Sequence, residues 1–362
     1  MKGRIDMKII SKLTALIAAG AIALSQISFV GASAEETEYY AFGDSIPAGY
    51  GLSETETGFP ELIAKKLGAK LTNYSVSGMT TDGFIEQISK MDGIYVDYIT
   101  ISIGSNNLLG PFQKIICETA GVSSAGELGD KISELYGEGG LAGLSNLSQL
   151  FTALNTALTD NAELNEACRK FAEEDMPKVI EAVSGKIDAS EGKAFFTNIY
   201  NPYYGVDIQF LGTSYLNLGE LADGYIQKMN AAIETATANN SFEVADVYTL
   251  MNKEGLTNVN ISTANLAQSS FDPHPNAAGH AALADFITNT LCDRQVGDIY
   301  CDGKINLKDL VRIVKIVAQL ETYEPSETVY LDCNVDGVVG IEDAALMIKY
   351  IAKFDVVLGT AA

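Results

Sequence analysis

The sequence has 362 residues, of which 47% are hydrophobic, and a formal net charge of -23 at pH 7. This length corresponds to roughly two domains of about 150 residues each, and the hydrophobic content is ample for buried cores, which excludes a wholly disordered chain. A surface this acidic repels nucleic acids and anionic membranes, and the absence of Trp argues against a sugar-stacking accessory module.

Residues 1–34 have the pattern of a secretory signal peptide. Four basic residues lead into an uncharged apolar run from Leu13 to Leu24, and the small residues 32–34 follow as a cleavage site. The run is shorter than the roughly 20 residues of a membrane-spanning helix, and no Cys follows the cleavage site to carry a lipid. We therefore expect a secreted, extracellular protein without a membrane anchor.

The chain contains five cysteines, an odd number, so at least one stays unpaired within an exported chain. Cys117 and Cys168 flank one segment, and the sequence allows either a bridge between them or two thiols. It does not fix the connectivity.

Residues 35–293 alternate strand-like and helix-like stretches, which favours a mostly parallel sheet with helices on both faces. Active sites of such sheets lie at the carboxyl ends of the strands. Residues 108–190 are longer than one crossover requires, and we interpret them as a helical insertion that forms either a lid or additional bulk. The expected strands are 38–42, 71–76, 97–103, 194–200 and 243–248, and the helical patterns between them include 60–67 and 221–238.

Ser45 is the candidate nucleophile, because the first expected strand runs into a glycine turn that lifts this hydroxyl above the sheet edge. A Ser hydroxyl needs a base to take its proton, and the two histidines of the chain, His274 and His280, lie in one stretch. Two flanking prolines place His274 in a stiff loop, whereas His280 falls in the helix that follows. We therefore predict His274 as the base.

Acyl transfer also needs hydrogen-bond donors for the oxyanion of the tetrahedral intermediate. Two further strand ends supply them. The second expected strand ends in Ser77-Gly78, where glycine lets a backbone N–H approach a ligand, and the third ends in Gly104-Ser105-Asn106-Asn107. Each tripeptide or tetrapeptide alone is an ordinary loop sequence, and the combination in one order carries the signal.

With these four blocks, the chain resembles the SGNH, or GDSL, hydrolases. The resemblance implies a flavodoxin-like three-layer α/β/α fold and a serine ester hydrolase that needs no cofactor for catalysis. By the same resemblance, Ser45 is the nucleophile and His274 the general base. The Ser45 N–H, the Gly78 N–H and the Asn106 side-chain amide form the oxyanion hole.

Two positions depart from the family pattern. Asn107 replaces the usual Asp of the third block, which we expect to affect loop support more than the oxyanion hole. The family acid usually stands three residues before the His, whereas Asp272 stands two before, so either Asp272 or a backbone carbonyl orients His274. Asn201 and Tyr203, which follow the fourth expected strand, either line the substrate mouth or form a turn.

Two similar segments, which start at Asp298 and Asp332, follow near the C-terminus. Each is an acidic loop that leads into an amphipathic helix, with the oxygen ligands and the glycine spacing of a calcium loop. Tyr300 occupies the third position of the first loop, so we expect that site to be the weaker one. The expected ligands are Asp298, Asp302, Asn306 and Asp309 in the first loop, and Asp332, Asn334, Asp336 and Asp343 in the second.

Residues 294–362 resemble a type I dockerin, which attaches a secreted enzyme to the cohesin domain of a scaffoldin. The resemblance implies two Ca²⁺ ions, and a domain of this size commonly needs metal to fold. Family dockerins contact cohesin at loop positions 10 and 11, here Leu307-Lys308 and Ile341-Glu342. Because these pairs differ in charge, interchangeable binding by both halves is doubtful.

Together these features predict a secreted, cellulosome-associated serine esterase that removes acetyl groups from plant cell-wall polysaccharide. Two alternatives stay open: a broad-specificity carboxylesterase or lipase acting on small or lipid esters, and a non-catalytic carbohydrate-binding subunit. The retention of Ser45, Gly78, Asn106 and His274 argues against the last.

Overall fold

The chain folds into two compact units, the larger formed by Thr37–Lys65 and Ala69–Leu291 and the smaller mainly by residues after Leu291. The computed structural model describes residues 37–359, apart from 125, 138, 188–192, 211–212, 241, 254, 263–269, 292–294, 301–302 and 324–326. The expected signal peptide and Asp302 therefore lie outside the described residues. None of the described helices combines the length and the apolar character that a bilayer crossing requires.

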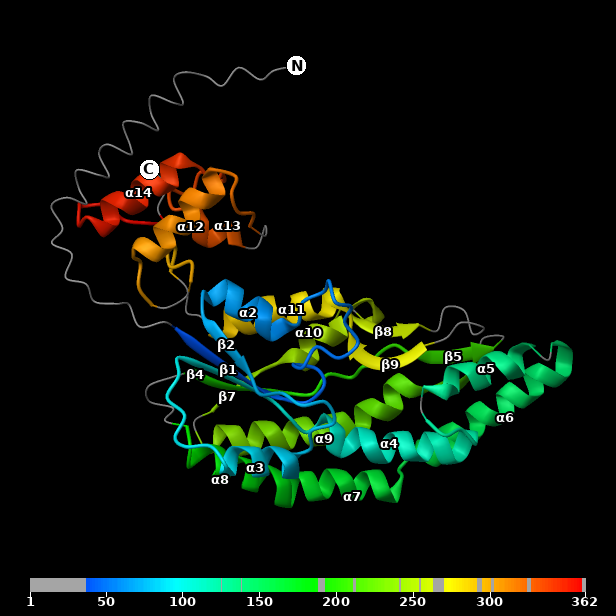
Figure 1. Cartoon of the computed structure of the whole chain (residues 1–362). Coiled ribbons are helices and arrows are strands. Elements are labelled where there is room, and N and C mark those ends of the chain that lie inside the picture. Colours follow the sequence, from blue (N-terminus) through cyan, green and yellow to red (C-terminus); the bar gives the residue numbers. More distant parts are fainter. Residues whose placement is uncertain are drawn as a thin grey trace, which may run out of the picture. The chain divides into compact units, whose positions relative to one another are not determined.

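The larger unit is built on one five-stranded parallel sheet with the order β2-β1-β3-β4-β7 (Figure 1). Each strand overlaps one that the sequence predicts, and the strand order is that of flavodoxin-like folds, so the predicted fold class is confirmed. The order reverses between β1 and β3, whose carboxyl ends lie side by side. The strands are β1 (Glu38–Gly43), β2 (Lys70–Asn73), β3 (Tyr98–Ser102), β4 (Lys193–Thr197) and β7 (Glu243–Ala245).

Helices cover both faces of this sheet, because its strands are apolar on both sides (Figure 1). One face carries α2 (Phe59–Leu67), α10 (Val247–Lys253) and α11 (Ala277–Leu291). The other carries α3 (Thr81–Ser89), α4 (Ser105–Ala120), α7 (Ala162–Lys170), α8 (Met176–Ser184) and α9 (Leu218–Ala238).

The expected insertion at 108–190 is helical where it is described. It comprises α4, α5 (Glu127–Gly137), α6 (Gly140–Leu158), α7, a single π-helical turn η1 (Phe171–Asp175) and α8. Cys117 of α4 and Cys168 of α7 are both free thiols, and so is Cys333 further along the chain. The bridge that the sequence left open between the first two is therefore absent.

Two antiparallel ribbons supplement the main sheet. One pairs β5 (Asp207–Phe210) with β6 (Thr213–Asn217), and the other pairs β8 (Val259–Ser262) with β9 (Ser270–Pro275). His274 lies in β9, so its placement in a loop is wrong. The flanking prolines cannot donate ladder hydrogen bonds, but a two-stranded ribbon with a register shift between Val259 and Ile261 tolerates them at its edge.

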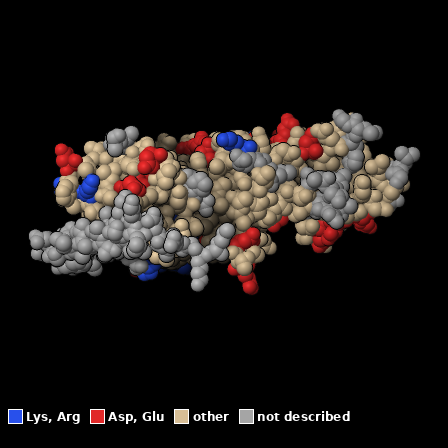
Figure 2. Space-filling model, turned by 90° about the horizontal axis from the view of Figure 1, so that it is seen from above, with Lys and Arg blue, Asp and Glu red and all other residues tan. Residues whose placement is uncertain are grey.

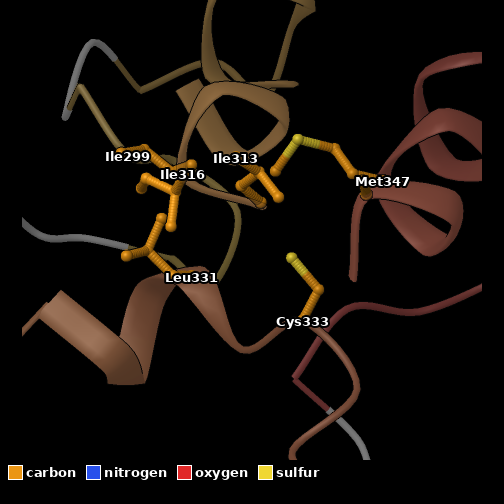
Figure 3. Close-up of a cluster of buried hydrophobic side chains, with 7 residues drawn as sticks. Ile299, Ile313, Ile316, Leu331, Cys333 and Met347 are labelled. Atoms are coloured by element: carbon orange, nitrogen blue, oxygen red, sulfur yellow. The ribbon is translucent and has the colours of Figure 1, made fainter. Parts of the chain in front are cut away.

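The smaller unit contains α12 (Leu307–Val317), α13 (Thr328–Leu331) and α14 (Ile341–Ile351). Its core is one cluster of buried side chains between these helices (Figure 3), namely Ile299, Ile313, Ile316, Leu331, Cys333, Ala344 and Met347. Acidic side chains are scattered over the molecular face drawn in Figure 2, in keeping with the net charge of the chain.

Candidate active site

Ser45 reaches the carboxyl edge of the sheet because Gly43 ends β1 next to the end of β3. Gly43 pairs with Ser102, and a Cβ atom at Gly43 would lie 2.3 Å from the Ser102 carbonyl oxygen. Its φ of 155° also favours glycine. Only glycine fits this close approach, and the chain then turns to place Ser45 beside the loop that follows β3.

Ser45, His274 and Asp272 form a continuous chain of hydrogen-bonding groups. The Ser45 Oγ lies 2.9 Å from His274 Nε2, and His274 Nδ1 lies 2.5 Å from Asp272 Oδ1. The same carboxylate oxygen accepts the His274 backbone N–H at 3.1 Å. A carboxylate at Nδ1 fixes the proton on that nitrogen, which leaves Nε2 as the acceptor for a serine proton.

The Asp272 carboxyl group is held in its charged form. Partial burial raises its pKa, but the hydrogen bonds that it accepts from the His274 side chain and backbone outweigh burial, so the pKa lies below its ordinary value. The structure therefore gives His274 a side-chain carboxylate partner two residues away, rather than the backbone carbonyl that the sequence left as an alternative.

Two tyrosines that the sequence analysis missed hold the His274 region. The Tyr50 ring lies 4.5 Å from the His274 ring, centroid to centroid, and the buried Tyr200 donates its hydroxyl proton to the Pro273 carbonyl at 2.7 Å. Both contacts span long stretches of sequence, and neither tyrosine belongs to a recognisable local pattern.

The predicted oxyanion donors come from the two neighbouring strand-end loops. Asn106 Nδ2 donates to the Met79 carbonyl at 3.0 Å, which joins the loops and leaves its second amide hydrogen for a ligand. Within the described residues, the backbone N–H groups of Ser45 and Gly78 have no hydrogen-bond partner. Gly78 has a φ of 81° and open space where a side chain would project.

Asn107 connects the same two loops more firmly. Its Oδ1 accepts the Thr81 N–H at 3.1 Å, and its Nδ2 donates to Thr81 Oγ1 at 2.7 Å and to Asp175 Oδ2 at 3.0 Å. Asp175 is buried in η1 and pairs with Lys170. This agrees with the expectation that position 107 supports the loop, but no pattern in the sequence indicates Asp175 as its partner.

Two buried titratable groups flank the site without completing it. Burial raises the pKa of Asp44 to about 6, against the opposing effect of the Ile46 N–H that its Oδ1 accepts. His280 is fully buried in α11, its Nδ1 accepts the Phe59 N–H at 3.2 Å, and burial lowers its pKa to about 4. His280 is therefore a structural histidine, and the imidazole beside the Ser45 hydroxyl is that of His274.

A cavity opens beside Ser45 and His274 and continues between α4 and α9. Tyr203 lines this cavity, whereas Asn201 is buried outside it and donates its side-chain amide to the Gly219 carbonyl at 2.8 Å. The segment also forms a turn. The predicted substrate-lining role therefore fits the position of Tyr203 and does not fit that of Asn201.

The second acidic loop is held by bonds between its own side chains and backbone. Asp332 Oδ2 accepts the Gly337 N–H at 2.7 Å, and Asp343 accepts the Asn334 and Gly340 N–H groups. Asn334 Nδ2 donates to Asp336 at 2.9 Å. These oxygen donors are the ligand type that Ca²⁺ prefers. Asp332, Asn334, Asp336 and Asp343 all belong to this one loop.

The first loop repeats part of this arrangement. Asp309 accepts three backbone N–H groups, from Ile299, Tyr300 and Asn306, and Asp298 accepts that of Gly303. The Tyr300 ring lies under Lys308 Nζ, 4.7 Å from the ring centroid. Among the side chains that the structure describes, no three His, Cys, Asp or Glu residues are gathered tightly enough to form a ready-made metal cluster.

The fold and the polar groups at its strand ends are those of a flavodoxin-like hydrolase. Residues 41–282 match the GDSL-like lipase/acylhydrolase family, and because this match covers more than half of the chain, the chain belongs to that family of ester hydrolases. Residues 296–353 match the type I dockerin domain. Both predicted resemblances are confirmed.

Solved structures similar to this chain include phospholipase A1 from Streptomyces albidoflavus NA297, with 14% identity over 71% of this chain and 100% of that chain and a TM-score of 0.48. An extracellular lipase from Streptomyces rimosus has 17% identity over 70% and 99%, with a TM-score of 0.47. Axe2, an acetylxylan esterase from Geobacillus stearothermophilus, has 12% identity over 74% and 97%, with a TM-score of 0.39. None of the curated protein sequences matches the chain.

Proposed function

We propose that the chain is a serine esterase in which Ser45 attacks the ester carbonyl. The observation that carries this proposal is the pair of hydrogen-bonding distances that join Ser45 to His274 and His274 to Asp272, 2.9 and 2.5 Å. Ser45 and His274 lie 229 positions apart along the chain, so only the fold brings them together.

In the proposed reaction, His274 Nε2 takes the Ser45 proton as Oγ bonds to the carbonyl carbon. Asp272 stabilises the imidazolium ion that forms. The imidazolium then protonates the leaving alcohol, which departs and leaves an acyl group on Ser45. Water, deprotonated by the same imidazole, hydrolyses this acyl-enzyme and restores Ser45.

The negative charge that develops on the carbonyl oxygen needs donors that are already in place. The Ser45 and Gly78 N–H groups and the second amide hydrogen of Asn106 are the donors that we assign to it. The hydrogen bond from Asn106 Nδ2 to the Met79 carbonyl oxygen, 3.0 Å long, supports this assignment, because it fixes the two loops relative to each other.

Substitution of the nucleophile tests the proposal most directly. We expect Ser45→Ala to lower kcat on p-nitrophenyl esters by about 10⁴-fold or more, since loss of a triad member removes the covalent route. Ser53→Ala, which changes an exposed loop serine, is the matched control. A serine-reactive phosphonate should label the wild type and the control and spare Ser45→Ala. Wild-type turnover by Ser45→Ala would exclude Ser45 as the nucleophile, and absence of turnover in the wild type itself would favour a non-catalytic carbohydrate-binding subunit.

For the smaller unit we propose calcium-dependent attachment to a cohesin domain, with secretion by the N-terminal segment. Type I dockerin domains bind calcium. The donor chemistry of the second loop fits Ca²⁺, with Asp332, Asn334, Asp336 and Asp343 as the residues that would hold it, and Asp298, Asp302, Asn306 and Asp309 in the first. Cohesin binding measured with and without a chelator tests this assignment.

Attachment to a scaffoldin would bring the esterase to plant cell walls, so we propose acylated polysaccharide as its natural substrate, with acetyl groups as the simplest case. Acetate release from acetylated xylan measures this directly. The second candidate, a carboxylesterase of larger acyl groups, is favoured by one observation, the apolar lining of the cavity beside Ser45.

A further inference from the structure

The cavity between α4 and α9 opens at the side chains that we assign to catalysis. Ser45, Asn106 and His274 line its polar end, so an ester carbonyl at Ser45 would have one of its two substituents inside the cavity. We infer that this is an acyl pocket that prefers linear acyl groups of about four to six carbons over acetyl. The inference rests on the proposed serine esterase activity.

The walls away from Ser45 are hydrocarbon. Leu108 and Phe112 contribute from α4, Ala222 and Ile226 from α9, and Ile199 from the segment after β4; all five are buried. The rings of Phe112 and Tyr203, which both line the cavity, stack with their centroids 5.8 Å apart. A sugar placed here would lose its hydrogen bonds with water without replacement, so the acyl group is the substituent that suits this cavity.

The size of the cavity sets the length of the acyl chain. Its volume is about 70 Å³. One water molecule needs roughly 10–15 Å³ by this measure, so the cavity has room for about five groups of that size. An acetyl group places only its carbonyl and one methyl group there and leaves most of the apolar wall uncovered. A butanoyl to hexanoyl group fills it, and a decanoyl group exceeds it.

Each methylene group that the transition state buries should raise kcat/KM by about fourfold, from the transfer free energy of a CH₂ group. Two further methylenes predict a preference for butanoyl over acetyl of at least about tenfold. Because the cavity has room for only about five such groups, the gain should stop at about six carbons and reverse for longer chains.

The test is a series of p-nitrophenyl acetate, butyrate, hexanoate and decanoate, with kcat/KM divided by the rate of alkaline hydrolysis of each ester. We expect a maximum at four to six carbons for the wild type. Ala222→Leu places three additional carbons in the cavity and should lower the butyrate-to-acetate ratio at least fivefold. Phe112→Leu enlarges the cavity and should move the maximum toward longer chains, which gives a second readout if Ala222→Leu folds poorly.

Ala231→Leu is the matched control, because Ala231 lies on the same helix with its side chain exposed, and its chain-length profile should equal that of the wild type. An acetate preference in the wild type would overturn the inference, and so would an unchanged ratio in folded Ala222→Leu. Either result leaves the serine esterase proposal standing as long as the activity is lost in Ser45→Ala. Activity that persists in Ser45→Ala overturns the proposed function instead.

Discussion

The two units of the chain place their polar side chains by different means. In the larger unit, the hydrogen bond between Ser45 and His274 joins residues 229 positions apart, so the packed sheet and the β8–β9 ribbon determine the geometry. In the smaller unit, Asp332 and Asp343 bond to backbone groups five and nine positions away, within a single turn. In the first arrangement side chains bond to one another, whereas in the second the acidic side chains bond to backbone N–H groups of their own loop.

The buried cores of the two units also differ in extent. The sheet of the larger unit is buried on both faces, but the smaller unit has one compact cluster that includes Ile313, Leu331 and Met347 (Figure 3). A core of this size supplies little stability by itself, and small domains often depend on a metal. Loss of metal should therefore destabilise the smaller unit and leave the larger unit folded and active.

Removal of calcium should have the largest effect. We expect EDTA to unfold the smaller unit and abolish cohesin binding, because the carboxylates of each loop then face one another without a cation. Circular dichroism and cohesin binding measure both losses, while esterase activity should persist. Asp343→Asn should weaken calcium binding, with the exposed Asp355→Asn as control. Unchanged spectra and unchanged binding in EDTA would contradict the proposed calcium sites.

The next effect concerns Asn107, which bonds to Asp175 across 68 positions. Asn107→Asp would set two carboxylates against each other at this contact and displace the loops of the oxyanion hole. We expect kcat to fall by about 100-fold with KM little changed, since the oxyanion exists only in the transition state.

The exchanged pair Asn107→Asp with Asp175→Asn restores one amide and one carboxylate, and should recover most of kcat. Asn107→Ala removes the hydrogen bonds without adding charge, so Asp175→Asn should not restore its kcat. If the double variant is no better than Asn107→Asp alone, the repulsion between the two carboxylates is not the cause of the loss.

A smaller effect is the pH dependence that the buried carboxyl group of Asp44 gives to the free energy of unfolding. Burial raises the pKa of Asp44 from 3.8 to about 6, so the folded state holds this proton more tightly than the unfolded chain. Asp44 therefore adds to the free energy of unfolding below about pH 4. This contribution, about 3 kcal/mol in total, is lost as the pH rises through 6.

Asp44→Asn carries no such proton. The free energy of unfolding of the wild type minus that of Asp44→Asn should fall by about 2 kcal/mol between pH 4 and pH 7, as measured by urea titration at each pH. The lowered pKa of His280 acts in the opposite direction in both proteins and cancels in this difference. A difference that does not vary with pH would show that Asp44 titrates normally.

The smallest effect on turnover is expected from deletion of the smaller unit. A chain that ends before Val296 should keep kcat and KM within about twofold of the full chain, because Ser45, Asp272 and His274 all belong to the larger unit. It should lose cohesin binding entirely. A marked loss of turnover would show that the smaller unit supports the larger one.

The sequence predicted the elements whose signal is local. Buried strands such as β1 and β3 are short apolar runs bounded by turn residues, and the glycines at their ends mark the loops that carry Ser45 and Asn106. Amphipathic periodicity likewise indicated α2 and α9. These patterns depend on residues a few positions apart, so one sequence suffices to recognise them.

The features that the sequence did not reveal depend on partners far away. Pro273 and Pro275 argued for a loop, and only pairing with β8 makes that segment a strand. The hydroxyl of Tyr200 and the carboxylate of Asp175 are placed by tertiary packing, over 73 and 68 positions. The π-helical turn that carries Asp175 has no composition that distinguishes it from the flanking helices.

The proposed nucleophile and its proposed base lie in separate elements, since Ser45 follows a central strand of the main sheet and His274 belongs to the two-stranded β8–β9 ribbon. A two-stranded ribbon opens at a lower cost than a sheet buried on both faces. On heating, esterase activity should therefore be lost at a lower temperature than the helical circular dichroism signal. Cooling before the sheet unfolds should restore the activity.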